Sequence, residues 1–325
     1  MEPTNFTAKA RRIGNADVFV AKPGRQWIEE SINTPDPRKL CSSLWYEGEL
    51  CCFFAPSNMG KSLFAVQLGM EIAKELNETV LYFDFEQSSK QFEARYTNRE
   101  ARTIYNIPDK FVRVKFSDFM AYGDFDQLIA DIEALTVRMN SHIIIIDNLS
   151  WLLNDSEKGK DAGDLMKLLC ELKARRGLSM LVLAHTPKRD PWMPLTQDSL
   201  AGSKRLANFM DSIFAMGKDY SEGDDCSRYI KQVKVRYGMM EYGAASVARY
   251  RIVQSPDMVG MAYVGPGNEH ELLKGAMSDG AAAAAEEMET IRRMSAEGAT
   301  QRRIAEAIGR SAAYVNRRKA ADKGA

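Results

Sequence analysis

Residues 55–62 have the sequence APSNMGKS, whose residue types suit a loop that binds phosphate. The loop follows the apolar run Leu50–Phe54 and precedes an apolar, helix-compatible segment, so we expect it to join a strand to a helix. Backbone N–H groups of such a loop and the positive end of the following helix can cradle phosphate oxygens. We predict that the loop binds ATP, that Lys61 reaches the β- and γ-phosphates and that Ser62 coordinates Mg²⁺. The predicted nucleotide-binding residues are Ser57, Asn58, Met59, Gly60, Lys61, Ser62 and Leu63.

The loop departs at one position from the pattern G-x-x-x-x-G-K-[ST]. Ala55 occupies the place of the first glycine, which requires a backbone conformation that an L-residue tolerates. Gly60 occupies the place of the second glycine, so the backbone can still approach a phosphate closely there. The alternative is a strand, turn and helix that contain Gly-Lys-Ser by chance.

Acidic residues follow two other apolar runs, where they can supply a metal ligand and a base. Residues 142–147, with the sequence HIIIID, predict a buried strand that delivers Asp147 to its C-terminal end, beside Ser62 and Mg²⁺. Thr79–Phe85 predicts the strand after the loop's helix, and Asp84 and Glu86 stand two residues apart at its end. Because Glu86 lies further along the chain, we predict that it orients and deprotonates the attacking water, with Asp84 in reserve. The alternative for Asp147 is an acid that merely ends a strand and caps the next element, and the alternative for Asp84 and Glu86 is solvation of a strand end by acids.

These residues require a sheet whose strands end at one edge. Short β-rich runs alternate with helical segments from residue 50 to residue 184, and the strands are unbroken apolar runs, as expected for parallel strands covered on both faces. The predicted fold class is therefore α/β, with a mostly parallel twisted sheet. From about Met210 the pattern changes to strands without long helices between them, which predicts antiparallel additions at one sheet edge. Those later strands are Ser212–Met216, Arg228–Arg236, Ala248–Val253 and Met261–Val264.

Taken together, these motifs resemble the RecA-type P-loop ATPases, which include recombinases, circadian-clock ATPases and hexameric helicases such as the small plasmid RepA-type enzymes. The shared pattern is a phosphate loop on the first core strand, a catalytic Glu on the adjacent strand, a metal-binding Asp and a polar sensor after the next strand. That sensor strand ends here in His185, which by resemblance contacts the γ-phosphate. The resemblance covers about residues 38–265 and implies a RecA-like core, ATP and Mg²⁺ as ligands, and a homo-oligomer in the form of a hexameric ring. A satisfied structural histidine is the alternative at position 185.

Two further segments gain a meaning from this resemblance. The Pro-rich polar loop after His185 resembles a DNA-facing pore loop, in which Lys188 and Arg189 neutralise phosphates and Trp192 stacks on a base of single-stranded DNA. Lys234 and Arg236, followed by a glycine, resemble the pair that reaches a neighbouring subunit's γ-phosphate, with Arg236 as the arginine finger. An ordinary surface loop and a solvated strand face are the respective alternatives.

The C-terminal segment differs from the rest in charge and pattern. Residues 300–325 contain seven Lys or Arg against two Asp or Glu, a net charge of +5 in a chain whose 44 cationic and 44 acidic side chains balance. Breaks near Gly298 and Gly309 divide residues 287–325 into three helices, and this range resembles the helix-turn-helix of resolvases. By resemblance its third helix binds duplex DNA, and a plain three-helix interaction module is the alternative. The predicted DNA-contacting residues are Arg310, Tyr314, Asn316, Arg317 and Arg318.

The predicted organisation has four parts. Residues 1–37 form an N-terminal arm, 38–271 the RecA-like ATPase domain, 272–285 a linker or the first turns of a helix, and 286–325 the helix-turn-helix. Five cysteines without metal-binding spacing, the lack of a secretion signal and the lack of a long apolar run favour a soluble, cytoplasmic protein with no membrane partner.

We predict an oligomeric DNA-dependent ATPase that acts as a helicase or as a replication or mobilisation factor. Two other classes fit parts of the sequence. A nucleotide-switched DNA-binding regulator needs the same loop and the same C-terminal module but no unwinding. A small-molecule kinase shares the phosphate loop and leaves the basic C-terminal module unexplained.

Overall fold

The computed structural model describes residues 20–98, 100–116, 124–152, 160–187, 190–200, 203–255 and 258–322. The chain divides into two compact units, Met1–Arg38 and Lys39–Ala325. Within the described residues, the first unit contains the helix α1 (Gly24–Ser31). None of the helices in these ranges has both the length and the apolar composition needed to cross a bilayer.

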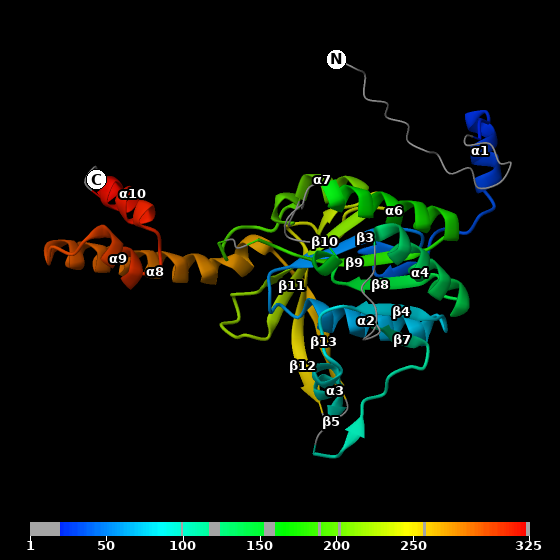
Figure 1. Cartoon of the computed structure of the whole chain (residues 1–325), viewed down its shortest axis with the longest axis horizontal. Helices are drawn as coiled ribbons and strands as arrows, with labels where there is room; N and C mark the ends of the chain where they lie inside the picture. Colours follow the sequence, from blue (N-terminus) through cyan, green and yellow to red (C-terminus); the bar gives the residue numbers. More distant parts are fainter. Residues whose placement is uncertain are drawn as a thin grey trace. The chain divides into compact units, whose positions relative to one another are not determined.

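The second unit is built on a nine-stranded sheet with the strand order β13-β12-β11-β10-β3-β9-β8-β4-β7 (Figure 1). Two small ribbons, β1–β2 and β5–β6, lie outside it. The strands of the main sheet are β3 (Leu50–Ala55), β4 (Val80–Asp84), β7 (Phe111–Val114), β8 (Ile143–Asp147), β9 (Ser179–His185), β10 (Ser212–Lys218), β11 (Ser227–Lys234), β12 (Val247–Ser255) and β13 (Met258–Gly267). The ribbons consist of β1 (Lys39–Cys41), β2 (Trp45–Tyr46), β5 (Thr97–Asn98) and β6 (Thr103–Ile104).

The predicted fold class is confirmed: the sheet is mostly parallel and its C-terminal strands are antiparallel. Strands β10, β3, β9, β8, β4 and β7 are mutually parallel, and β11, β12 and β13 each run antiparallel to the preceding strand. The prediction was wrong for one strand, because β10 pairs in parallel with β3 instead of joining the antiparallel group. The short helix α7 (Ser203–Phe209) precedes β10 and returns the chain to the edge where β3 begins.

Alternation along the strands produces a hydrophobic core on each face of the sheet. Phe54 and Ile144 pack on one side with residues of α4 (Phe125–Arg138) and α6 (Lys160–Arg176). Phe53 and Ile145 pack on the other side with residues of α2 (Lys61–Glu75). Figure 1 shows the corresponding layers, with α2 on one side of the strands and α6 and α7 on the other. This arrangement explains why the strands are unbroken apolar runs.

Short helices follow several strand ends. α3 (Ser89–Arg95) comes after β4 and begins with a capping box between Ser88 and Gln91. α5 (Leu149–Leu152) comes after β8, and the 3₁₀ helix η1 (Gln197–Ser199) follows β9. Because the six parallel strands share one C-terminal edge, the polar residues after β3, β4, β8 and β9 converge there.

The C-terminal helices are α8 (Glu269–Ala296), α9 (Gln301–Ala307) and α10 (Ala312–Asp322). Thr300 caps α9, as its side chain accepts from the Arg303 amide. A small core of Ile291, Ile304, Ala305 and Val315 joins the three helices. The range 272–285, for which the sequence left a linker or a first helical turn open, lies inside α8.

Candidate functional site: a phosphate-binding pocket at the sheet edge

The loop after β3 has the backbone of a phosphate-binding loop. Ala55 is the last residue of β3 and is fully buried, so the position of the first expected glycine is an ordinary strand position. Asn58 (φ 64°) and Gly60 (φ 93°) adopt left-handed conformations on either side of Met59. Gly60 then serves as the N-cap of α2, whose first residue is Lys61. Such alternation turns successive N–H groups toward one side, where the positive end of a helix also favours an anion.

A cavity of about 600 Å³ lies over this loop and brings together most of the residues predicted to bind the nucleotide. The loop and the first turn of α2 form one wall, and Glu86 and His185 form part of another. Gln87, Gln91 and Arg95 after β4 and Val259 of β13 also line it. The predicted residues on its walls are Ser57, Asn58, Met59, Gly60, Lys61, Ser62, Leu63, Glu86 and His185.

Asp147 ends β8 beside this cavity and has the properties of a Mg²⁺ ligand. Its side chain is fully buried, and its Oδ2 accepts a hydrogen bond of 2.6 Å from the Tyr82 hydroxyl. Burial raises the pKa of Asp147, while the positive charge of Lys61 and the hydroxyls of Ser62 and Tyr82 oppose that rise. Its Oδ1 is buried without a hydrogen-bond partner among the described residues, so it has lone pairs available for a cation or a bound water. Ser62 and Asp147 therefore fit a Mg²⁺ ion, whose positive charge would stabilise phosphate oxygens.

Glu86, Asn148 and His185 form one hydrogen-bonded cluster at the ends of β4, β8 and β9. His185 Nε2 lies 3.2 Å from Glu86 Oε1 and 2.9 Å from Asn148 Nδ2, and Asn148 Nδ2 also donates to Glu86 Oε1. The contact with His185 lowers the pKa of Glu86, burial opposes that shift and Lys61 reinforces it. Glu86 is therefore ionised at neutral pH and can accept a proton from water.

Asp84, the reserve candidate for the base, has a different environment. β4 ends at Asp84, whose fully buried carboxylate accepts from the Gln87 amide (2.8 Å) and the Glu86 amide (3.2 Å). Arg113 of β7 forms an ion pair of 2.6 Å with it. Asp84 and Glu86 would lie on the same face of the sheet if the strand continued through both of them. The strand ends at Asp84, so the two side chains do not share a face by strand alternation. Asp84 therefore holds the turn that carries Glu86.

Lys234 and Arg236 lie at the opposite end of the sheet from the phosphate loop. The register pairs Lys234 with Ile213, whose parallel partner Cys52 is near the start of β3. The part of β3 after Cys52 and the phosphate loop lie between this level of the sheet and Lys61. At about 3.3 Å per residue, they separate Lys234 and Arg236 from Lys61 by about 15 Å or more. Arg236 Nη1 forms an ion pair of 2.6 Å with Asp211, and Lys234 Nζ donates to two carbonyls at the end of α7. The structure thus does not bring this pair to the phosphate loop of its own chain.

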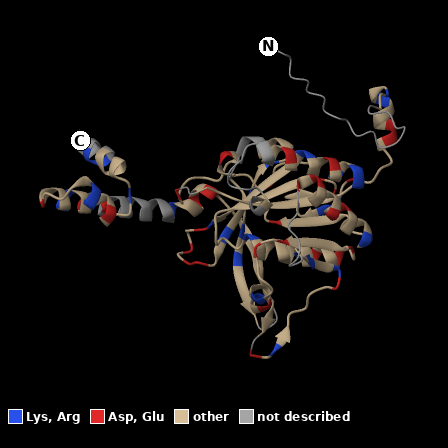
Figure 2. Ribbon diagram, viewed as in Figure 1, with Lys and Arg blue, Asp and Glu red and all other residues tan. Residues whose placement is uncertain are grey.

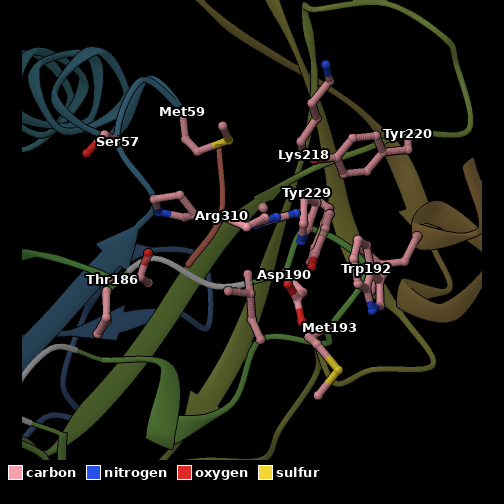
Figure 3. Close-up of a pocket in the computed structure, with 16 residues that line it drawn as sticks. Ser57, Met59, Thr186, Asp190, Trp192, Met193, Lys218, Tyr220, Tyr229 and Arg310 are labelled. Atoms are coloured by element: carbon pink, nitrogen blue, oxygen red, sulfur yellow. The ribbon is translucent and has the colours of Figure 1, made fainter. Parts of the chain in front are cut away.

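The loop after His185 lines a second cavity, of about 700 Å³, next to the first. Trp192 lies there on the same side as Tyr220, with Ser57 and Met59 of the phosphate loop across the cavity (Figure 3). The aromatic ring predicted to stack on DNA therefore shares this cavity with the phosphate loop and lies across it from Ser57. Lys188 and Arg189, the cations predicted to bind DNA phosphates, lie outside the described residues.

In the C-terminal helices, two of the predicted DNA-contacting residues bind an acid of α8. Arg310 donates to Glu287 (2.8 Å) and the Tyr314 hydroxyl donates to the same carboxylate (2.7 Å). Asn316 is exposed, Arg318 lies 5.9 Å from the Tyr314 ring centroid, and the side chain of Arg317 is outside the described set. Lys and Arg outnumber acids on α10 (Figure 2).

Sequence reasoning missed several residues of the pocket and its support. Asn148 directly follows Asp147, so its position at a strand end was a usable signal. Tyr82 precedes Asp84 by two residues and contacts Asp147 from the neighbouring strand. Gln91 and Arg95 had no comparable signal, because α3 is a short helix whose path cannot be read from an apolar pattern.

Comparison with known proteins agrees with this geometry. The family model AAA_25, described as an AAA domain, matches residues 20–191, which is more than half of the chain. A solved structure described as an ATPase domain is 11% identical, with a TM-score of 0.55 over 73% of this chain and 95% of that chain, and therefore shares the fold. The KaiC-like protein PH0186 from Pyrococcus horikoshii OT3 is 15% identical, with a TM-score of 0.47 over 67% and 91%. No curated protein matches the chain. The chain therefore belongs to the AAA_25 family of P-loop ATPases and has a RecA-like core.

Proposed function

We propose that this P-loop ATPase is an oligomeric, DNA-dependent motor that hydrolyses ATP with Mg²⁺, as a helicase or a replication or mobilisation factor. In this account Lys61 binds the β- and γ-phosphates, Ser62 and Asp147 hold Mg²⁺, and Glu86 activates the attacking water. His185 contacts the γ-phosphate. The solved ATPase domain with the TM-score of 0.55 supports the fold on which this proposal rests. The proposed DNA role is argued from residues of this chain.

The observation that carries the DNA role is the direct connection between His185 and the loop that contains Trp192. His185 ends β9 and contacts Glu86, and the chain enters this loop directly after His185, with no helix or strand between β9 and Trp192 in the described part of the loop. A ligand that moves this loop would therefore also move His185, which contacts the proposed catalytic base Glu86. Single-stranded DNA suits the loop because an aromatic ring stacks on any base.

The location of Arg236 supports assembly of several subunits. Since Arg236 lies at the far end of the sheet from its own phosphate loop, it can approach a γ-phosphate only when that nucleotide is bound by another copy. The Arg236 side chain is 61% exposed and is therefore accessible for such a contact. To make the contact, Arg236 must leave Asp211 and bind the phosphate instead. We infer a homo-oligomer, a hexameric ring in the simplest case, with hydrolysis at the subunit interfaces.

The C-terminal helices favour a second candidate function, a nucleotide-switched regulator that binds duplex DNA without unwinding it. They have a core of their own, a four-residue connection between α9 and α10, and a basic last helix. In a regulator, ATP controls assembly on DNA and hydrolysis resets it. In a motor, the same helices would direct the ATPase to a duplex site.

Titration of the ATPase reaction with DNA distinguishes these functions. We expect single-stranded DNA to raise the hydrolysis rate several-fold and Trp192→Ala to weaken that stimulation, because base stacking is worth about 1–3 kcal/mol per base. Met193→Ala, at the exposed neighbouring position, is the matched control. Slow hydrolysis that single strands leave unchanged, combined with binding to duplex DNA, would favour the regulator, and failure to bind either form of DNA would overturn the proposal.

A further inference from the structure

Arg228 of β11 lies buried behind the phosphate loop, and no motif of the sequence singles it out. Only 5% of its surface is exposed. Its Nε donates a hydrogen bond of 2.9 Å to the carbonyl oxygen of Met59, and its Nη1 donates one of 2.8 Å to the Ser227 carbonyl. Burial lowers the pKa of this guanidinium, while Cys226 and nearby acids of the same hairpin oppose that shift.

Burial of a guanidinium that binds only carbonyl oxygens is energetically unfavourable, because the charge loses its hydration. Among the described residues Arg228 makes no direct ion pair, so its hydrogen bonds to carbonyls and the more distant charges of Asp224 and Asp225 compensate for its lost hydration. Buried charges with such compensation are frequent at functional sites. The positive charge stands directly behind the segment that is predicted to receive a triphosphate.

The hydrogen bond to Met59 fixes the direction of the next amide. The Met59–Gly60 peptide bond is trans, so the Met59 carbonyl and the Gly60 N–H point to opposite sides. Because the carbonyl faces β11, the N–H faces away from β11. In the strand order, β3 lies between β10 and β9, so this direction leads from β11 toward the strands that deliver Glu86 and His185.

We infer that Arg228 is a positioning residue for nucleotide binding. It holds the Met59–Gly60 peptide so that the Gly60 N–H points into the phosphate pocket, and it places a positive charge behind the bound triphosphate. The inference rests on the proposed function, since it assumes that the pocket binds ATP. It assigns part of the affinity for the phosphates to a residue that lies on another strand, 169 positions away from Met59.

Arg228→Met tests this role, because methionine fills similar volume without charge or donors. We expect the Kd for ATP and for free tripolyphosphate to rise about 10- to 100-fold, the worth of a hydrogen bond from a charged group. The KM for ATP should rise with it while kcat changes little, since binding in the ground and transition states is lost equally. Arg251→Gln is the matched control, as Arg251 lies opposite Ser227 on β12 and is 45% exposed.

Arg228→Lys decides the question if Arg228→Met does not fold. A lysine keeps the charge, but its single nitrogen cannot reproduce the planar arrangement of two donors on separate nitrogens, so we expect its Kd for ATP to rise several-fold. A purely structural role predicts a lower Tm with an unchanged Kd in whichever variants fold, and that result overturns the inference. Absence of ATP binding by the wild-type protein would instead overturn the proposed function.

Discussion

Replacement of Glu86 by glutamine is expected to reduce ATP hydrolysis by about two to four orders of magnitude, the range that general-base catalysis supplies. The amide keeps the shape of the carboxylate and its contact with His185 but cannot take a proton from water. Binding of ATP should be retained, because Lys61, the loop amides and the Mg²⁺ ligands are unchanged. Phosphate release under saturating ATP, together with a direct nucleotide-binding measurement, checks both parts.

Glu71→Gln is a suitable control, since Glu71 lies on the exposed side of α2 and bonds Gln67. Hydrolysis by Glu86→Gln within a few-fold of wild type would mean that another group activates the water. The same variant separates the two proposed functions. A motor should lose DNA-stimulated hydrolysis, whereas a switch should be held in its ATP-bound, DNA-bound state.

Replacement of Arg236 by alanine is expected to lower kcat by about three orders of magnitude or more, as for other arginine fingers, with ATP binding retained. The physical reason is the loss of a positive charge that reaches the γ-phosphate from a neighbouring subunit. Steady-state hydrolysis at several protein concentrations measures the effect. Arg138→Ala, at an exposed position on α4, provides the control.

Mixing Arg236→Ala with Glu86→Gln tests action between subunits. In a mixed oligomer, some interfaces combine the intact Glu86 of the first variant with the intact Arg236 of the second. We therefore expect two nearly inactive proteins to regain hydrolysis when they are mixed. A mixture as inactive as its components, under conditions where the wild-type protein assembles, would show that Arg236 does not complete the site of another copy.

The residues that converge on the phosphate pocket were predictable because they all end strands. The loop after β3, Glu86 after β4, Asp147 of β8 and His185 of β9 share the C-terminal edge of one parallel sheet. An apolar run followed by a polar residue is visible in the sequence, and parallel strands place such residues together.

Other features depend on contacts that no local pattern encodes. The contacts that hold Asp84 in the turn before Glu86 depend on a distant partner, because Arg113 lies 29 residues further along the chain. β10 is parallel to β3 because α7 returns the chain to the edge where β3 begins. This helix has seven residues, which is too short to give a clear helical periodicity in the sequence. Arg228 is one cation among several on its hairpin, and only the folded sheet brings it to Met59.

The central claim is that the phosphate loop, with Mg²⁺ held by Ser62 and Asp147, hydrolyses ATP. Phosphate release should therefore be compared for the wild-type protein and Lys61→Ala, each with Mg²⁺ and with excess EDTA. We expect sustained hydrolysis by the wild-type protein only when Mg²⁺ is present, and none above background by Lys61→Ala. Equal rates for the two proteins, or a wild-type rate that EDTA leaves unchanged, would contradict the claim.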